Sequence, residues 1–269
     1  MPSSVLQRNN VRIFGKGTQP MLFAHGFGCD QNMWRYLTPS FENDYKIILF
    51  DYVGSGKSDI SAWNPARYEN LRGYAQDILD IVRELDLQNV ILVGHSVSSM
   101  TGLLAANEEP ARFDRLVMVG PSPCYINDDG YNGGFSRADI EGLLDTMEKN
   151  YIGWANFLAP AIMGQPGRPE LGAELAESFC STDPVIARRF AEATFFSDNR
   201  RDLHHARVPS LILQCSNDII APTTVGDYLA QTLPQSTLRV MKATGHCPHM
   251  SEPEETIRLI KEYLAPAAA

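Results

Sequence analysis

The sequence predicts an α/β fold in which a mostly parallel, doubly wound sheet carries helices on both faces and is interrupted by one helical insertion. Two observations and one rule of strand connection support this prediction. Short, continuously apolar runs alternate with helical patterns, which is typical of parallel strands buried on both faces. Connected right-handed crossovers between such strands give a layered sandwich. One long interval contains no strand-like run at all.

The expected strands follow an N-terminal segment, residues 5–14, which we expect to form two short strands about the turn Asn9-Asn10. The apolar runs that come next lie at residues 21–24, 46–52, 89–94, 116–120, 210–215 and 237–241. Helical patterns cover residues 71–85, the stretch from 96 through 106, and residues 255–264.

Residues 127–201 break this alternation. We expect several helices there, separated near Asn150, across residues 164–169 and at Asp183-Pro184. An insertion of this kind between two sheet strands is a candidate lid. The sequence therefore predicts an α/β core made of residues 1–126 and 202–269, and a helical lid at 127–201.

Composition narrows the class of protein. The chain has 269 residues and a net charge of −9, so we expect neither nucleic acid nor an anionic membrane as a partner, because both attract basic patches. No basic stretch with a following apolar run opens the chain, and no apolar stretch approaches the ~20 residues of a membrane span. Five cysteines without a CxxC pair favour free thiols in a reducing compartment. We expect a soluble, cytoplasmic protein.

The sequence predicts no metal and no cofactor. Residues 54–58 (GSGKS) look like the end of a phosphate-binding loop, but that motif needs a glycine at position 51, where the sequence has Asp51. We therefore expect a surface turn at 54–58. There is also no G-x-G-x-x-G for a dinucleotide, and no cluster of His, Cys, Asp or Glu with metal-ligand spacing.

The strongest chemical signal is the segment GHSVS at residues 94–98. A strand that turns sharply into a helix with a serine at the apex is a nucleophile elbow, and Ser96 would be that serine. Gly94 supplies the small residue before it, whereas Ser98 stands where a second glycine would complete G-x-S-x-G. Backbone N–H groups at a helix N-terminus favour a developing anion. The alternative is an ordinary helix-capping serine.

Two further signals follow strands later in the chain. Asp218 comes just after the strand at 210–215, and His246 follows the last strand in a loop bracketed by glycine and proline. Parallel sheets place their sites at the carboxyl ends of strands. On its own Asp218 would be a turn residue or a helix cap. His249 competes with His246, which we favour because it lies nearer the strand end and follows a glycine.

The order Ser96, Asp218, His246 along the chain is that of the α/β-hydrolase arrangement. Serine becomes a nucleophile when an imidazole takes its proton, and the carboxylate fixes the imidazole tautomer and stabilises its cation. The tetrahedral intermediate then needs two oxyanion donors. We assign these to Val97 N–H and to Phe27 N–H, the latter in the HGFG loop after the first parallel strand.

Bulky aromatic side chains concentrate in the insertion, which suggests an apolar pocket above Ser96 for a small, largely hydrophobic ligand. The alternative is that these rings only join the lid helices to the core. The insertion residues predicted to line the pocket are Phe135, Trp154, Phe157, Phe195 and Phe196.

Several segments carry a family resemblance: HGFGCDQ at 25–31, FDYVGSG at 50–56, GHSVS at 94–98, VGPSP at 119–123 and GGF at 133–135. They resemble the RsbQ-like branch of the α/β-hydrolases, to which the plant karrikin and strigolactone receptors also belong. The segments CSTDP and GHCPH look closer to RsbQ, whereas the serine at 98 is similar to the plant receptors. The resemblance covers nearly the whole chain.

The resemblance implies an α/β-hydrolase fold, a triad of Ser96, Asp218 and His246, and a four-helix lid over an apolar cavity with Phe27 and Phe135 near its mouth. It implies slow hydrolysis of small esters or lactones, butenolides among them, often coupled to signalling through a protein partner.

Three functions remain open on the sequence. The first is an esterase or lactonase for a small apolar acyl compound. The second is a ligand-binding signalling receptor in which hydrolysis is secondary. The third is an acyltransferase or perhydrolase. A haloalkane dehalogenase is disfavoured, because that chemistry needs an aspartate where this chain has Ser96.

Overall fold

The computed structural model describes residues 4–265, and within them seven strands form one sheet in the order β1-β3-β2-β4-β5-β6-β7. Their bounds are β1 Arg12–Phe14, β2 Pro20–Ala24, β3 Lys46–Leu49, β4 Val90–His95, β5 Phe113–Val119, β6 Ser210–Asn217 and β7 Ser236–Thr244. Only β1 runs antiparallel to its neighbour. The predicted fold class, a mostly parallel sheet wound with helices, is confirmed.

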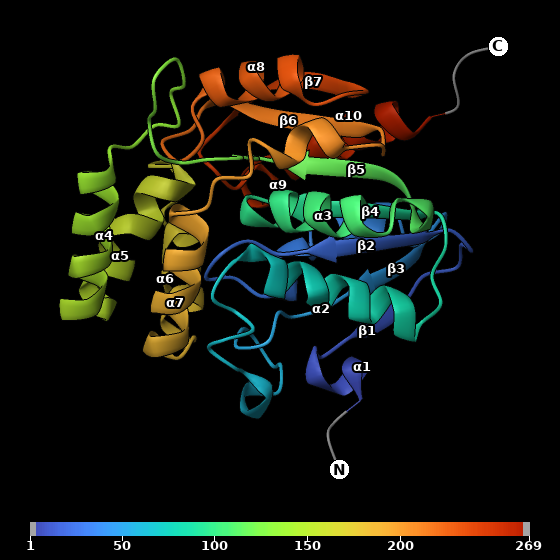
Figure 1. Cartoon of the computed structure of the whole chain (residues 1–269), viewed down its shortest axis with the longest axis horizontal. Coiled ribbons are helices and arrows are strands. Elements are labelled where there is room, and N and C mark those ends of the chain that lie inside the picture. The colour runs from blue at the N-terminus through green and yellow to red at the C-terminus, as the bar shows by residue number, and fades with distance from the viewer. Residues whose placement is uncertain (1–3, 266–269) are drawn as a thin grey trace.

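Helices cover both faces of the sheet and group at one of its ends (Figure 1). Their bounds are α1 Val5–Arg8, α2 Leu71–Glu84, α3 Val97–Glu108, α4 Arg137–Lys149, α5 Tyr151–Met163, α6 Pro169–Cys180, α7 Pro184–Phe195, α8 Thr223–Thr232, α9 Pro248–Ser251 and α10 Pro253–Leu264. Helices α2, α3 and α8 share one hydrophobic core with one face of the sheet. Helices α9 and α10 pack on the other face.

Strand β2 shows why the parallel strands read as continuous apolar runs. Successive side chains of a strand point to opposite faces. Met21 and Phe23 enter the core on the face that carries α9 and α10, whereas Leu22 and Ala24 enter the core on the face that carries α2 and α3. Because helices bury both faces, neither side of the strand tolerates polar residues.

The helical insertion comprises α4–α7, which leave the sheet after β5, return before β6, and stand apart from the helices along the sheet (Figure 1). Its breaks coincide with those expected. Asn150 separates α4 from α5 and caps α5 by accepting the Gly153 N–H. Gly164 ends α5 in the left-handed conformation, and Asp183 caps α7 ahead of Pro184. That this insertion acts as a lid stays a prediction.

The prediction of two strands in residues 5–14 is wrong in its first half. Val5–Arg8 forms the short helix α1, and only Arg12–Phe14 forms a strand. The Ser4 hydroxyl accepts the Gln7 N–H and so caps the turn. Strand β1 lies at the sheet edge, where three residues pair with β3.

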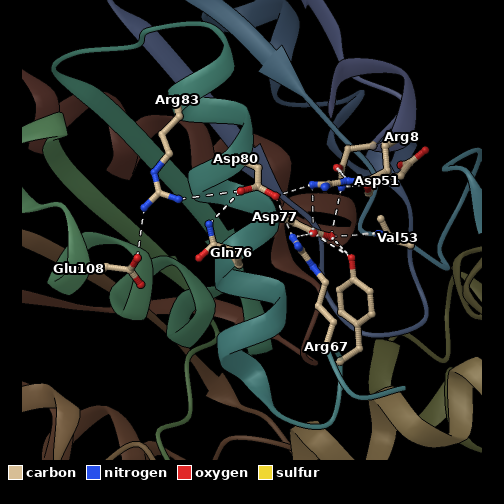
Figure 2. A network of polar contacts seen from close by, with 11 residues as sticks. Arg8, Asp51, Val53, Arg67, Gln76, Asp77, Asp80, Arg83 and Glu108 are labelled. Carbon is tan, nitrogen blue, oxygen red and sulfur yellow. Dashed lines mark hydrogen bonds and ion pairs between the residues drawn. The ribbon is translucent and has the colours of Figure 1, made fainter. Parts of the chain in front are cut away.

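A buried ion network fastens the N-terminal helix to α2 and to the loop after β3 (Figure 2). Asp77 of α2 is completely buried. Its Oδ1 lies 3.4 Å from Arg8 Nη2 and 2.7 Å from Arg67 Nη2, and it also accepts the Tyr68 hydroxyl at 2.9 Å. Its Oδ2 accepts the Val53 N–H at 3.2 Å. The carboxylate thus fills its acceptor sites from three segments of the chain.

Asp77→Ala is expected to destabilise the fold by about 3–5 kcal/mol, because it leaves the buried Tyr68 hydroxyl and the Val53 N–H without their acceptor and removes one of the two carboxylates that Arg8 and Arg67 share. Urea unfolding measures the free energy. Asp145→Ala, which removes an exposed ion pair with Lys149, serves as the control and should change stability little. A loss below about 1 kcal/mol for Asp77→Ala would show that the network carries little of the stability.

Candidate active site

Ser96 occupies a sharp turn between β4 and α3. Its backbone has φ 56° and ψ −123°, a region that non-glycine residues adopt only under external restraint. The Ser96 N–H donates to the Val119 carbonyl of β5 at 2.8 Å. A Cβ on Gly94 would collide with the Ser98 carbonyl across the turn. The elbow expected from the sequence is therefore present, and its first glycine is required by space.

Asp218 follows β6 directly and is almost completely buried. One carboxylate oxygen, Oδ1, accepts the N–H groups of Ile220 and Ala221 at 2.8 and 3.2 Å. The other oxygen, Oδ2, lies 2.6 Å from His246 Nδ1. The loop backbone thus orients the carboxylate so that its free oxygen faces the imidazole.

His246 joins Asp218 to Ser96. Its Nε2 lies 2.7 Å from Ser96 Oγ, and its Nδ1 faces Asp218. Because a carboxylate only accepts hydrogen bonds, Nδ1 carries the proton and Nε2 accepts from the Ser96 hydroxyl. The arrangement can move a proton from the serine to the imidazole. All three side chains are buried, which strengthens these charge-assisted contacts.

His249, the competing histidine, does not reach Ser96. Its ring packs between Trp34 and His95, at centroid distances of 4.8 and 4.3 Å. Neither of its ring nitrogens has a hydrogen-bond partner among residues 4–265. Burial, with the nearby His246 ring as a smaller cause, lowers the pKa of His249 to about 3.

The loop after β2 is held between β4 and α6. A Cβ on Gly26 would lie 2.5 Å from His95 Nδ1. Gly28 has φ 69°, and a Cβ there would strike the Phe179 ring of α6. Both glycines of the HGFG segment are therefore required, one by space and the other by space and backbone conformation.

Two backbone N–H groups lie in the segments that border Ser96. Val97 is the first residue of α3, where N–H groups have no partner within the helix. Phe27 lines the same cavity as Ser96, and its N–H has no hydrogen-bond acceptor within the described part of the chain. Their role as oxyanion donors stays a proposal.

Ser96 opens into a cavity of about 30 Å³. The residues around it are Phe27, Cys29, His95, Ser96, Tyr125, Ile162, Leu175, Phe179, Thr194, Phe195, Ile220, His246 and Cys247. Tyr125 OH and Thr194 Oγ1 are buried there without a hydrogen-bond partner among the described residues. Burial raises the pKa of the Tyr125 phenol. The Ser96 hydroxyl lies beside the phenol and partly opposes this rise. The wall is apolar with two free hydroxyls.

Of the predicted pocket residues, some line the cavity at Ser96 and others lie behind it or elsewhere. Phe27 and Phe195 line the cavity. Trp154 is buried one layer behind it, edge-on to Phe27 at a centroid distance of 6.3 Å. Trp154 belongs to the inner stripe of α5, which continues through Leu158 and Ile162 at four-residue spacing.

Three other aromatic residues predicted to line the pocket lie away from this cavity. Phe157 is 80% exposed, because it falls outside the inner stripe of α5. Phe196 lies past the end of α7 and packs beneath the Arg137 guanidinium at 5.2 Å. Phe135 pairs through its backbone with Ile126 ahead of α4. Neither of these two lines the cavity at Ser96.

Sequence reasoning missed most of the cavity wall. Leu175 and Phe179 lie four residues apart on α6, so helical periodicity could have identified them. Tyr125 follows the end of β5, the same kind of position that identified Asp218. Nothing local to the sequence indicated Thr194, which is buried near the end of α7.

The insertion touches both loops that flank Ser96. The Ser178 hydroxyl of α6 donates to the Gly28 carbonyl at 2.8 Å. The His246 N–H donates to the Ile162 carbonyl near the end of α5, also at 2.8 Å. The position of the insertion is thus linked mechanically to the loop after β2 and to the loop that carries the imidazole.

Residues 4–265 show no sign of a metal centre, a membrane span or a disulfide. No group of three His, Cys, Asp or Glu side chains there could hold a metal ion. None of the helices in this range is long and apolar enough to cross a membrane. The five cysteines are free, and only Cys180 is exposed.

His249 should make stability depend on pH. Its folded-state pKa of about 3 lies below the ordinary value of 6.5, so the unfolded chain binds the proton first as the pH falls. Stability is therefore complete above about pH 6.5 and is lost toward pH 3, by about 1.4 kcal/mol per pH unit. His249→Phe should lose about 1.4 kcal/mol less than the wild type between pH 7.5 and 5.5 by urea unfolding. Equal pH dependence would contradict this.

Comparisons with known proteins place the chain in a family. The Alpha/beta hydrolase family model matches residues 21–259. The karrikin insensitive 2 receptor CA of Petunia hybrida is 37% identical over 261 residues, 97% of each chain. Strigolactone esterase RMS3 of Pisum sativum is 36% identical over 255 residues, 94% of this chain and 95% of the relative. A solved hydrolase structure from Oleispira antarctica is similar at a TM-score of 0.94 and 47% identity, covering 96% of this chain and 95% of that one. This chain belongs to the alpha/beta hydrolase family.

Proposed function

We propose that this protein is a serine hydrolase that cleaves small, largely apolar esters or lactones with a triad of Ser96, His246 and Asp218. The observation that carries the proposal is the unbroken chain of contacts, 2.7 Å from Ser96 Oγ to His246 Nε2 and 2.6 Å from His246 Nδ1 to Asp218. Similarity to a protein named a strigolactone esterase supports the same class of reaction.

The reaction follows from the protonation pattern. As Ser96 Oγ attacks the carbonyl carbon, its proton passes to His246 Nε2, and Asp218 stabilises the imidazolium. The N–H groups of Phe27 and Val97 receive the negative charge that forms on the carbonyl oxygen. The alkoxide leaves with the proton from His246. Water then gives its proton to His246, attacks the acyl-enzyme, and releases the acid as Ser96 regains its proton.

The cavity wall indicates the kind of substrate. Its side chains are mostly apolar, so they favour a hydrophobic acyl or ring system. The free hydroxyls of Tyr125 and Thr194 can donate to substrate oxygens other than the reacting carbonyl. Residues of α5, α6 and α7 supply much of this wall, so a substrate that reaches Ser96 contacts the insertion.

A second candidate function is ligand reception, in which hydrolysis is secondary. The observation that favours it is the pair of contacts from the insertion to the Gly28 and His246 backbones. A ligand that displaces the insertion shifts both loops, so occupancy changes a surface that a partner could read. Similarity to proteins named karrikin receptors supports this function. A signalling partner and a cytoplasmic location remain part of this proposal.

Ser96→Ala should lower turnover of p-nitrophenyl acetate by at least about 10³-fold, because the acyl-enzyme cannot form. Intact-protein mass spectrometry should show an acyl adduct on the wild type after exposure to esters or lactones, and none on the variant. Near-wild-type turnover would remove Ser96 from the mechanism. If the variant still binds ligand and a partner with biological output intact, reception rather than hydrolysis is the main function.

Phe195→Ala should shift preference toward longer acyl chains, because it opens the wall beside Phe27 and Tyr125. We expect the ratio of kcat/KM for p-nitrophenyl hexanoate to that for the acetate to rise roughly tenfold. Phe157→Ala removes an equal ring from the surface of α5 and should leave the ratio unchanged. Equal ratios in wild type and Phe195→Ala would mean that Phe195 does not limit the acyl site.

A further inference from the structure

The residue that replaces the second glycine of the elbow has no role in the mechanism so far. Ser98 lies in the first turn of α3 and is completely buried. Its hydroxyl donates to the His25 carbonyl at the start of the loop after β2. Ser98 also contacts the Tyr52 hydroxyl at 2.9 Å. A serine in this position therefore connects the nucleophile helix to the loop that holds Phe27.

We propose that Ser98 is a positioning residue that fixes the oxyanion loop, residues 25–29, through the His25 carbonyl. The proposal rests on the proposed function, because the loop geometry matters only if Phe27 N–H stabilises an oxyanion.

The hydroxyls that meet at Ser98 form a chain of hydrogen bonds that ends on the His25 carbonyl. A carbonyl oxygen only accepts, so Ser98 must donate to His25. Ser98 has one proton, so Tyr52 must be the donor in the contact between them. The Thr101 hydroxyl has two acceptors within reach, Tyr52 Oη at 2.7 Å and the Ser98 carbonyl at 3.3 Å, and the shorter contact favours donation to Tyr52. Three buried hydroxyls therefore point in sequence toward one carbonyl, and each bond polarises the next.

The His25 ring holds the next peptide group. The Tyr52 N–H, which only donates, meets His25 Nε2 at 3.2 Å. The ring proton is therefore on Nδ1, which lies 2.9 Å from the Gly26 carbonyl and donates to it. Burial lowers the pKa of His25, which keeps this neutral tautomer. The Cys29 N–H donates to the same Gly26 carbonyl at 3.3 Å.

Peptide planarity transmits these contacts to Phe27. The Gly26 carbonyl and the Phe27 N–H belong to one planar trans peptide and point in opposite directions. When hydrogen bonds fix the direction of the Gly26 carbonyl, the Phe27 N–H is therefore fixed in the opposite direction. The preceding peptide is held by Ser98 through the His25 carbonyl. Two successive peptide planes are thus fixed, and the second of them carries the proposed oxyanion donor.

The loop after β3 supplies the rest of this frame. Tyr52 lies in the segment FDYVGSG, which the sequence singled out without a function beyond a turn. Asp51 in the same segment accepts the Gln31 N–H at 2.9 Å, just beyond the oxyanion loop. The segment therefore contacts the loop after β2 from both sides of Phe27, and Ser98 is the member that links this frame to the nucleophile helix.

The test compares Ser98→Ala, Tyr52→Phe and the double variant with Ser210→Ala. Ser210 is also fully buried and also donates to a backbone carbonyl, that of Val208 at 3.0 Å, but it lies at the opposite end of β6. Ester hydrolysis gives kcat and KM separately. A second readout is affinity for a trifluoromethyl ketone, which forms an oxyanion on Ser96, against that for the corresponding alcohol, which forms none.

We expect Ser98→Ala to lower kcat about 10- to 100-fold, which is no more than the loss of one oxyanion donor causes. The KM of the variant should stay within about threefold of the wild-type KM. Ketone affinity should fall by the same factor, and alcohol affinity should not change. Tyr52→Phe should show a smaller loss of the same kind. The double variant should match Ser98→Ala, since both act through one carbonyl.

Wild-type kcat and ketone affinity in Ser98→Ala would overturn the proposal, as would an equal loss in Ser210→Ala. If Ser98→Ala does not fold, Tyr52→Phe decides: parallel loss of kcat and ketone affinity supports the proposal, and unchanged values overturn it. A wild type that neither hydrolyses esters nor forms a Ser96 adduct would refute the proposed function itself. A wild type that turns over beside an unaffected Ser98→Ala would refute only the positioning role.

Discussion

The backbone conformation of Ser96 is the constraint on which the site depends, because it aims one hydroxyl out of a buried strand end. A φ of 56° costs of order 1–3 kcal/mol in a non-glycine residue and persists only where surrounding structure imposes it. Here β5 holds the Ser96 N–H, Gly94 leaves room for the turn, and α3 is buried along its length. The packing of the whole sheet therefore stabilises the position of one oxygen atom.

The remaining parts reach that oxygen because parallel strands end at one edge of the sheet. Strands β4, β6 and β7 lead to the serine, the carboxylate and the imidazole, and β2 leads to Phe27. Each loop is then fixed by its own contacts: Asp218 by two backbone N–H groups, and His246 by a carbonyl of α5. The sheet brings the groups near one another, and local hydrogen bonds set their orientation.

This division explains what the sequence could predict. The three proposed triad side chains follow buried strands directly, so their convergence follows from topology. The pocket depends on the rotation of each insertion helix, which aromatic content does not reveal; Trp154 faces inward and Phe157 faces solvent although both lie on α5. The helix at residues 5–8 begins at a local capping serine, Ser4, which the strand prediction overlooked, and Arg8 fastens it to distant α2. The sequence shows only that Ser98 departs from the G-x-S-x-G motif. Its partner, the His25 carbonyl, lies far away in the chain.

The contacts between the insertion and the loops at Ser96 bear on how hydrolysis and reception could share one site. We propose that a substrate displaces part of the insertion on entry, because α5, α6 and α7 supply much of the wall around Ser96. The insertion also contacts the Gly28 and His246 backbones, so displacement disturbs the loops of the proposed oxyanion donor and base. On this proposal, the geometry needed for catalysis returns when the insertion settles again around the bound molecule. Turnover then requires closure over the ligand, and if the chemical step is slow, the closed, occupied state persists long enough for a partner to recognise it.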